Sequence, residues 1–449
     1  MALTAGEAGR KLLHMTVGGF ALLLRFLSWP QAAAAAVTAF LFNWQVLPRI
    51  GGRALWRDHE HRAGSALGML IYPLSVLGLV LLFRDELWKA AAVWALLAYG
   101  DGMAGLVGQA VGGPRLPWNP RKGWAGLLAF VLFGALCATA LAGWTLRLPP
   151  AEWSAAWILG PVLAAALLAA LAETVPTTLD DNLTVPLVGA AGLWLATLAE
   201  PARLLQHPEL GQRLLAGLLV NAAVAALAMK ARSIDVPGAV SAVLIGTAIT
   251  AGTTLRGFAV MAAFFVVGSA VTKLGYRIKA ARGIAQEKGG ARGWRNAWAN
   301  GGVPALLALM AGLTPAGVSE LFVLAFAASV ATAAADTCSS EVGKAYGRRT
   351  FLITTFRPVP PGTEGAVSLE GTLGGLAGGA LVAAVGAALG LYTWPAAGLV
   401  ALAGLLGSLA ESVIGTVAER RGWLDNDLLN ALNTAIGGGL AALAARLLA

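Results

Sequence analysis

Charge and cysteine are both scarce in this chain of 449 residues. Only 12% of the residues are charged, whereas a soluble globular protein carries about 25%. The two cysteines, Cys137 and Cys338, lie far apart within or beside apolar runs, which favours neither a disulfide scaffold nor a zinc site. The sequence also lacks GxxxxGK[ST], HExxH, GxSxG and the HRD and DFG signatures. Any nucleotide chemistry would therefore need a phosphate site of another kind.

Long apolar segments are abundant. Hydrophobic residues make up 57% of the chain, and a transmembrane helix needs about 20 mostly apolar residues. Frequent glycine and alanine suit close helix packing in lipid. We expect an all-α polytopic membrane protein of about fifteen transmembrane helices, the first of which is not a cleaved signal peptide. The expected spans are 12–28, 31–47, 64–82, 88–106, 124–145, 155–173, 183–200, 212–230, 237–255, 257–274, 303–316, 318–340, 368–392, 394–415 and 428–447.

Basic residues indicate how these spans are oriented. Loops rich in Lys and Arg fall near 49–62, 115–122, 230–232, 277–295, 344–357 and 420–421. All of them lie on one side if the N-terminus is cytoplasmic, as the positive-inside rule predicts. We expect the inner (cytoplasmic) membrane as the location, and a net charge of +9 that reflects topology rather than nucleic-acid binding.

The two halves of the chain follow a similar order of residues. Asp101 precedes Gly108 by seven residues, and Asp336 precedes Gly343 by seven. A basic loop and a glycine-marked helix start follow in each half, and then a glutamate, Glu173 or Glu411, and an Asp/Asn cluster. This order predicts two parallel repeats of about seven spans joined by a linker helix. The expected domains are 1–205 and 236–449, with the linker at 206–235.

Acidic residues near these helix ends are the strongest functional signal. An Asp inside a span costs on the order of 2.5–3.5 kcal/mol and is usually functional. Carboxylate and amide oxygens suit Mg²⁺, which binds through one or two carboxylates and substrate phosphates. Arg and Lys in the adjoining loops can clamp phosphate oxygens, and glycines at helix starts expose N–H groups to an anion. These acids are Asp101, Glu173, Asp180, Asp181, Asp336, Glu341, Glu411, Asp425 and Asp427.

Each of these signals also has a purely structural interpretation. Basic loop residues are often topology signals, and glycines in spans are usually there for packing. A carboxylate near a helix end can reach water. Small neighbours and a following basic loop favour function for Asp101 and Asp336.

The first half resembles the phytol kinase and dolichol kinase family of CTP-dependent polyprenol kinases. The stretches that carry the resemblance are "GRKLLHMTVGG" (9–19), "GDGMAGLVGQAVGGPRLPWNPRKGWAG" (100–126) and "AETVPTTLDDNLTVPL" (172–187). They cover roughly residues 7–200. One departure is Gly123, at a position that the family often fills with serine.

The second half resembles a family of integral membrane domains that includes plant phytyl-phosphate kinases. The matching stretches are "GAVSAVLIGTAI" (238–249), 264–305, "ADTCSSEVG" (335–343) and "PPGTEGAVSLEGTLGG" (360–375). Together, the two resemblances imply a fusion that phosphorylates phytol or geranylgeraniol to the monophosphate and then to the diphosphate. The more basic loop at 277–295 fits an acceptor that is already a phosphate.

The resemblance implies in-line phosphoryl transfer with CTP and Mg²⁺ at the cytoplasmic face. In the first half, Asp101 and Glu173 would hold the metal, and Asp180 or Asp181, supported by Asn182, would orient or deprotonate the alcohol. Nucleotide and phosphate contacts there would come from Lys11, His14, Arg121, Lys122 and Gly126. In the second half, Asp336, Glu341 and Glu411 would hold the metal. Its phosphate contacts would come from Lys273, Lys279, Arg282, Lys288, Arg292, Thr363, Gly365 and Gly371.

Two other functions stay open at this stage. A cytidylyltransferase that makes a CDP-lipid would use the same nucleotide and metal but release pyrophosphate. A lipid-phosphate transporter would also have repeats and intramembrane acids, although its acids should lie near the midplane. The partners expected are the isoprenoid alcohol, its monophosphate, CTP and the lipid bilayer. The length of the alcohol, the donor for the second step, direct transfer of the monophosphate between sites, and the oligomeric state are left open.

Overall fold

The computed structural model describes residues 5–50, 67–285, 293–418 and 422–448. The chain divides into two units, Met1–Leu198 and Ala199–Ala449. In the described ranges nine helices are long and apolar enough to cross a membrane. This supports the expected polytopic α-helical membrane protein, but not the expected number of about fifteen spans.

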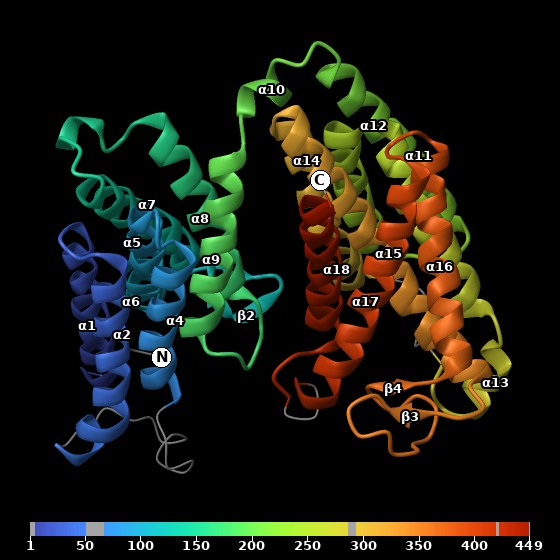
Figure 1. Cartoon of the computed structure of the whole chain (residues 1–449), viewed down its shortest axis with the longest axis horizontal. Coiled ribbons are helices and arrows are strands. Elements are labelled where there is room, and N and C mark those ends of the chain that lie inside the picture. Colours follow the sequence, from blue (N-terminus) through green and yellow to red (C-terminus); the bar gives the residue numbers. More distant parts are fainter. Residues whose placement is uncertain (1–4, 51–66, 286–292, 419–421, 449) are drawn as a thin grey trace. The chain divides into compact units, whose positions relative to one another are not determined.

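The first unit is helical apart from a small hairpin (Figure 1). Its helices are α1 (Ala5–Gly18), η1 (Gly19–Arg25), α2 (Trp29–Leu41), η2 (Phe42–Val46), η3 (Leu47–Arg49), α4 (Leu67–Leu82), α5 (Leu87–Ala95), η5 (Leu96–Gly100), α6 (Asp101–Val111), α7 (Trp124–Thr145), η6 (Pro150–Glu152), α8 (Ala156–Thr174) and α9 (Asp181–Leu198). The strands β1 (Arg115–Leu116) and β2 (Asn119–Gly123) pair antiparallel between α6 and α7.

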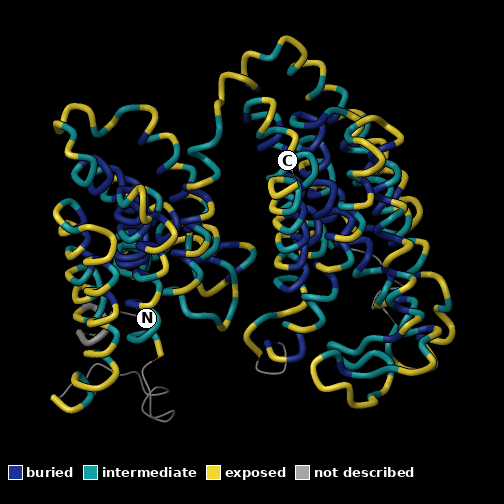
Figure 2. The backbone as a smooth tube through the Cα atoms, in the orientation of Figure 1, coloured by how far each residue is buried: buried dark blue, intermediate teal, exposed yellow. Residues whose placement is uncertain are grey.

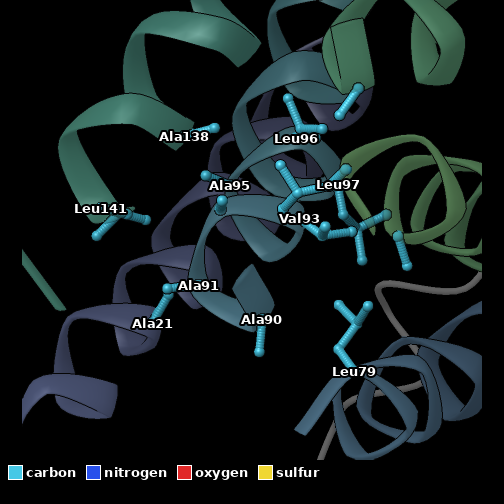
Figure 3. Packing of buried hydrophobic residues seen from close by; sticks show 14 of the residues in the cluster. Ala21, Leu79, Ala90, Ala91, Val93, Ala95, Leu96, Leu97, Ala138 and Leu141 are labelled. Atoms are coloured by element: carbon cyan, nitrogen blue, oxygen red, sulfur yellow. The ribbon is translucent and has the colours of Figure 1, made fainter. Parts of the chain in front are cut away.

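Helix α5 lies in the middle of this unit. Its side chains are buried on every face, from Ala90 to Val93 and on to Ala95, and such a helix must be surrounded by others. It packs against α4, α7, α9 and η1. Figure 3 shows Ala90, Val93 and their neighbours in this core. A π-helical turn, η5, leads directly from α5 into α6, and π turns often accompany functional sites.

Helix α7 shows how the chain meets lipid and protein on opposite faces. Leu128, Leu132 and Leu136 form a stripe along it, each exposed by more than three fifths, which suits a lipid-facing surface. On another part of the helix Gly126 meets Gly108 of α6. A Cβ on Gly108 would lie only 3.1 Å from the Gly126 Cα. The absence of side chains therefore lets the two backbones approach closely.

The second unit contains α10 to α18 and a second small sheet. Its helices are α10 (Pro201–Leu205), α11 (Leu210–Lys230), α12 (Val236–Lys273), α13 (Tyr276–Ala281), α14 (Trp294–Leu313), α15 (Ala316–Tyr346), α16 (Leu369–Ala388), α17 (Trp394–Ala418) and α18 (Asn426–Leu448). Strands β3 (Phe351–Leu352) and β4 (Ala366–Val367) pair antiparallel between α15 and α16. The expected linker helix, α11, belongs to this unit and packs against α12.

Helix α15 forms the core of the second unit. It contacts α12, α14, α16, α17 and α18, and the small residues from Ala325 to Ala335 are buried. Figure 2 shows buried backbone in the interior of each unit and exposed backbone at its outer helices and loops. The Ala-rich sequence explains the position of α15, because small side chains let several helices pack close to one axis.

The expected spans that the structure does not support differ from it for local reasons. Residues 64–66 of the expected span 64–82 lie outside the described residues, and its described part, Leu67–Leu82, is helical. Helix α2 has 13 residues and continues into a π turn. Spans 237–255 and 257–274 fall in the single element α12, which is interrupted at Thr254 with φ 67° and ψ −176°.

Candidate functional site

Three acidic side chains of the first unit meet at the ends of three helices. Asp101 begins α6, Glu173 lies in the last turn of α8, and Asp181 begins α9. One carboxylate oxygen from each lies within 4.8 Å of the other two. Asp101 and Glu173 are buried, and Asp181 is partly buried. Asp101 and Glu173 were expected from the resemblance to hold a metal, and the structure adds Asp181 to the same cluster.

Two lysines face this cluster from outside the three helices. Lys11 of α1 places its Nζ 2.7 Å from Asp101 Oδ2. Lys122 of β2 donates a hydrogen bond to Glu173 Oε1, and its Nζ lies 4.0 Å from Asp181 Oδ2. Three carboxylates and two ammonium groups leave the ionised cluster with a net charge of −1. Such a cluster can accept a cation or exchange its lysine contacts for phosphate oxygens.

The arrangement shifts the pKa values of Lys122 and Asp181, which lie outside the apolar spans. Burial tends to lower the pKa of Lys122, but the carboxylates of Glu173 and Asp181 outweigh it and raise that pKa. Lys122 therefore stays charged beside the acids. Burial raises the pKa of Asp181, which precedes the apolar part of α9, to about 6. A carboxyl with such a pKa can exchange a proton near neutral pH.

His14 lies on α1 and faces η5, the π-helical turn before Asp101. Its Nε2 is 3.0 Å from the Leu97 carbonyl oxygen and 3.9 Å from Asp101 Oδ2. A carbonyl oxygen can only accept, so Nε2 carries the proton in this contact. The ring also meets Tyr72 edge to face, with centroids 4.8 Å apart. His14 and Lys11, which the resemblance implied as nucleotide contacts, both lie beside Asp101.

The hairpin β1–β2 is fastened to the end of α8. Asn119 Nδ2 donates to the Thr174 carbonyl oxygen at 2.9 Å, and Trp118 Nε1 donates to Thr174 Oγ1 at 3.1 Å. The Asn119 Oδ1 accepts from the Arg121 backbone N–H at 3.0 Å. These contacts hold Lys122 beside Glu173. These contacts were not predicted from the sequence, although Trp118 and Asn119 lie in the motif "LPWNPRKG" (116–123), directly before Lys122.

The other predicted residues of the first unit surround this cluster. Asp180 Oδ1 accepts from the Asn182 backbone N–H at 2.9 Å, which caps α9. Asn182 Nδ2 donates to the Gly68 carbonyl oxygen at 3.3 Å and so ties α9 to α4. Arg121 is exposed on β2. Gly126 is buried against α6, so its position follows from packing.

A polar cavity in the second unit contains five of the predicted residues. It lies among α15, the β3–β4 loop, α16, α17 and α18 and is open to solvent. The predicted residues in its lining are Asp336, Thr363, Gly365, Gly371 and Glu411. The carboxyl groups of Asp336 and Glu411 lie close to each other. Asn433 Nδ2 donates to Glu411 Oε2 at 2.6 Å, a contact that the sequence did not predict.

The loop residues of this cavity have identifiable backbone roles. Gly365 has φ +71°, and a Cβ there would overlap the Thr416 side chain, so glycine is needed at this close approach. The Gly371 backbone N–H donates to Ser368 Oγ at 3.1 Å, which caps α16. Thr363 Oγ1 donates to the Pro360 carbonyl oxygen at 2.8 Å. These contacts shape the loop around the opening of the cavity.

Lys279 and Glu341 form a buried ion pair outside this cavity. The Lys279 side chain is 1% exposed, and its Nζ donates to Glu341 Oε2 and to the Thr272 carbonyl oxygen. Neither residue is in the cavity lining. The structure therefore does not bring Glu341 together with Asp336 and Glu411, because Lys279 already engages it.

The remaining predicted basic residues are dispersed. Arg282 Nη1 donates to the carbonyl oxygen of Lys344 at 2.7 Å, and Lys344 lines the cavity. Lys273 is exposed at the end of α12. Lys288 and Arg292 lie outside the described residues.

Comparisons with known proteins identify relatives of this chain. The profile described as "Integral membrane protein DUF92" matches residues 219–438. An uncharacterised membrane protein of Synechocystis is 44% identical over 199 residues, which cover 44% of this chain and 77% of that protein. Arabidopsis Protein VTE6 is 42% identical over 44% of this chain and 62% of its own length. Arabidopsis Phytol kinase 1 is 28% identical over 42% of this chain and 66% of its own length. The alignments thus span less than two thirds of each plant protein, and no solved structure matches.

Proposed function

This chain belongs to the DUF92 family of integral membrane proteins, and we propose that it is a membrane phosphotransferase acting on isoprenoid alcohols. Its first unit would transfer phosphate from CTP to phytol or geranylgeraniol. Its second unit would convert the monophosphate to the diphosphate. Similarity to a protein named phytol kinase supports the reaction class, and the resemblance to CTP-dependent polyprenol kinases supports the donor.

The observation that carries the proposal is the meeting of Asp101, Glu173 and Asp181 within 4.8 Å. Three hard oxygen donors from three helices fit Mg²⁺, which is held by one or two carboxylates and by substrate phosphates. Asp101 and Glu173 would hold the ion. When bound, it would neutralise the charge on the triphosphate oxygens.

The side chains around this cluster can carry out in-line transfer. Lys11 and Lys122 would exchange carboxylate contacts for the phosphates of the nucleotide, since both ammonium groups lie beside the acids. The alcohol oxygen would attack the γ-phosphorus, and the bond from that phosphorus to the β–γ bridging oxygen would break, which releases CDP. Asp181 would take the hydroxyl proton, which its pKa of about 6 permits. Asp180 and Asn182 would hold the start of α9 in place.

A second site in the second unit is supported by the order of its elements. In each unit a helix bearing an Asp is followed by a small antiparallel hairpin, a helix, a helix bearing a Glu, and a last helix with acids at its start. Asp336 and Glu411 would correspond to Asp101 and Glu173. This correspondence supports the fusion of two related kinases and the parallel repeat.

We place both sites at the cytoplasmic face of the inner membrane, because the basic loops next to them follow the positive-inside pattern. The prenyl chain would lie in the bilayer with its head group at the interface. A neutral alcohol needs no positive charge to bind, whereas its monophosphate does. Lys344, which lines the cavity of the second unit, and Arg282, which donates to the Lys344 carbonyl oxygen, would supply that charge.

Separate inactivation of the two sites tests the proposal. Purified protein would be given phytol or geranylgeraniol, Mg²⁺ and CTP labelled at the γ-phosphate, and the lipid products would be separated. Asp101→Asn should stop alcohol phosphorylation but leave conversion of supplied monophosphate intact. Asp336→Asn should make the monophosphate accumulate. Asp85→Asn, whose side chain is 84% exposed, is the control and should behave like the unmodified protein.

Three outcomes would overturn parts of this proposal. Formation of a CDP-lipid with release of pyrophosphate would identify a cytidylyltransferase instead. Loss of both steps in either single variant, with the protein still folded, would refute the two-site arrangement. A clear preference for ATP in the first step, at equal concentration, would refute CTP as the donor.

A further inference from the structure

Asn433 presents an unpaired oxygen next to the acidic pair of the second unit. It lies on α18, is 1% exposed, and donates its Nδ2 to Glu411 Oε2 at 2.6 Å. Its Oδ1 is buried and has no hydrogen-bond partner among the described residues. A buried amide oxygen without a partner is destabilising, and each such group calls for an explanation.

The acids beside Asn433 also lack a basic partner. Among the described residues, no Lys or Arg nitrogen lies within 4.0 Å of the Asp336 or Glu411 carboxylate oxygens. In the first unit, by contrast, Asp101 and Glu173 each contact a lysine. Two adjacent carboxyl groups can coexist only if they share a proton or a cation lies between them.

We propose that Asp336, Glu411 and Asn433 form a divalent-cation site in which Asn433 supplies a carbonyl oxygen. Two carboxylates and an amide oxygen are hard ligands of the kind that Mg²⁺ and Mn²⁺ prefer. Water and substrate phosphates would complete the coordination from the polar cavity that Asp336 and Glu411 line. This assignment rests on the proposed function, in which a metal binds in the second unit. Asn433 takes the place expected for Glu341, because Glu341 pairs with Lys279.

The Asn433 amide could present either end to the acids. In the structure its N–H₂ end faces Glu411. A half-turn of the amide exchanges nitrogen and oxygen with little displacement of the side chain. The oxygen would then face the two carboxylates, and a bound cation would hold the three oxygens together.

Binding of Mn²⁺, measured by the electron paramagnetic resonance signal of the free ion, tests this site without relying on catalysis. The full-length protein would carry Asp101→Asn and Glu173→Gln to silence the first cluster. One Mn²⁺ should still bind, and Asp336→Asn or Glu411→Gln should abolish that binding. Asn433→Leu should weaken it by about 10- to 100-fold, and Asn433→Asp should tighten it because it adds a charged ligand.

Asn430→Leu is the matched control, since Asn430 is also buried on α18, one turn earlier, and should leave Mn²⁺ affinity unchanged. Size-exclusion profiles identify variants that fail to fold, and Asn433→Asp keeps the size of the side chain. Absence of any residual Mn²⁺ site would overturn the inference and leave a shared proton as the explanation. Equal Mn²⁺ affinity in both Asn433 variants and the parent would also overturn it. Mn²⁺ binding without kinase activity would instead count against the proposed function alone.

Discussion

Replacement of Lys11 by methionine should destabilise the first unit through one buried charge. The Lys11 Nζ lies 2.7 Å from Asp101 Oδ2, with side chains 23% and 9% exposed. Removal of one member of a buried ion pair costs about 3–5 kcal/mol, because the other charge is left uncompensated. A unit of this size loses about 2–4 °C of melting temperature per kcal/mol. We therefore expect Lys11→Met to lower the melting temperature by about 6–20 °C.

The measurement is thermal unfolding of the purified protein in detergent, followed by circular dichroism. Lys89→Met is the control, because Lys89 is 7% exposed, and so more buried than Lys11, but its partner Glu86 is 51% exposed. Water can solvate Glu86, so that change should cost no more than about 1 kcal/mol. Addition of Mg²⁺ should raise the melting temperature of Lys11→Met more than that of the unmodified protein, since the cation can replace the ammonium group.

The double variant Lys11→Met with Asp101→Asn separates charge from packing. Neither charge remains in it, so most of the lost stability should return. If Lys11→Met melts within about 2 °C of the unmodified protein, the Asp101 carboxylate does not depend on Lys11. If the double variant is as unstable as Lys11→Met, the loss comes from packing of the lysine stem.

Three further predictions concern packing, charge and the second unit. Gly126→Ala should lower the free energy of unfolding by about 1–3 kcal/mol, because the added Cβ would lie 3.1 Å from a carbonyl oxygen of α6. Gly160→Ala is the control, since a Cβ there meets nothing within 4 Å. Thermal unfolding of both variants measures the difference, and equal stability would contradict the prediction. Arg295→Gln should lower the free energy of unfolding by less than about 1 kcal/mol in the same assay. Arg295 bridges two aspartates at the start of α18, but its side chain is 51% exposed. A loss of several kcal/mol would contradict this prediction. Arg282→Gln should raise the Michaelis constant for the monophosphate by about ten- to a hundredfold and leave alcohol phosphorylation unchanged; unchanged steady-state kinetics would remove Arg282 from the site.

The positions of the longest helices could be predicted because their sequences leave little choice. The expected span 124–145 has the same limits as α7, and 155–173 differs from α8 by one residue at each end. A run of about 20 apolar residues can satisfy its backbone in lipid only as a helix. Runs near that limit are less certain. The expected span 31–47, for example, is a helix of 13 residues, α2, that passes into a π turn, and hydropathy does not reveal that change.

The acids of the candidate site could be predicted more readily than their partners. Asp101 and Glu173 stand out in the sequence because carboxylates are rare in apolar runs. The sequence does not reveal which cation meets which acid across 90 positions, as Lys11 meets Asp101. Lys279 and Glu341 illustrate the limit. Each was expected as a ligand of substrate or metal, yet the fold pairs them with each other.

The difference in counter-charge between the two units bears on the order of the proposed steps. In the first unit two lysines contact the acids directly, so a metal–triphosphate complex would replace internal ion pairs and the alcohol would add no charge. In the second unit Glu411 accepts a hydrogen bond from the Asn433 amide. Lys344 lines the same cavity but, among the described residues, forms no ion pair with Asp336 or Glu411. In a site of that kind the basic groups can bind the ligand, because they do not pair with the carboxylates of the site. An acceptor that already carries a phosphate would benefit from such a distribution, and a neutral alcohol would not.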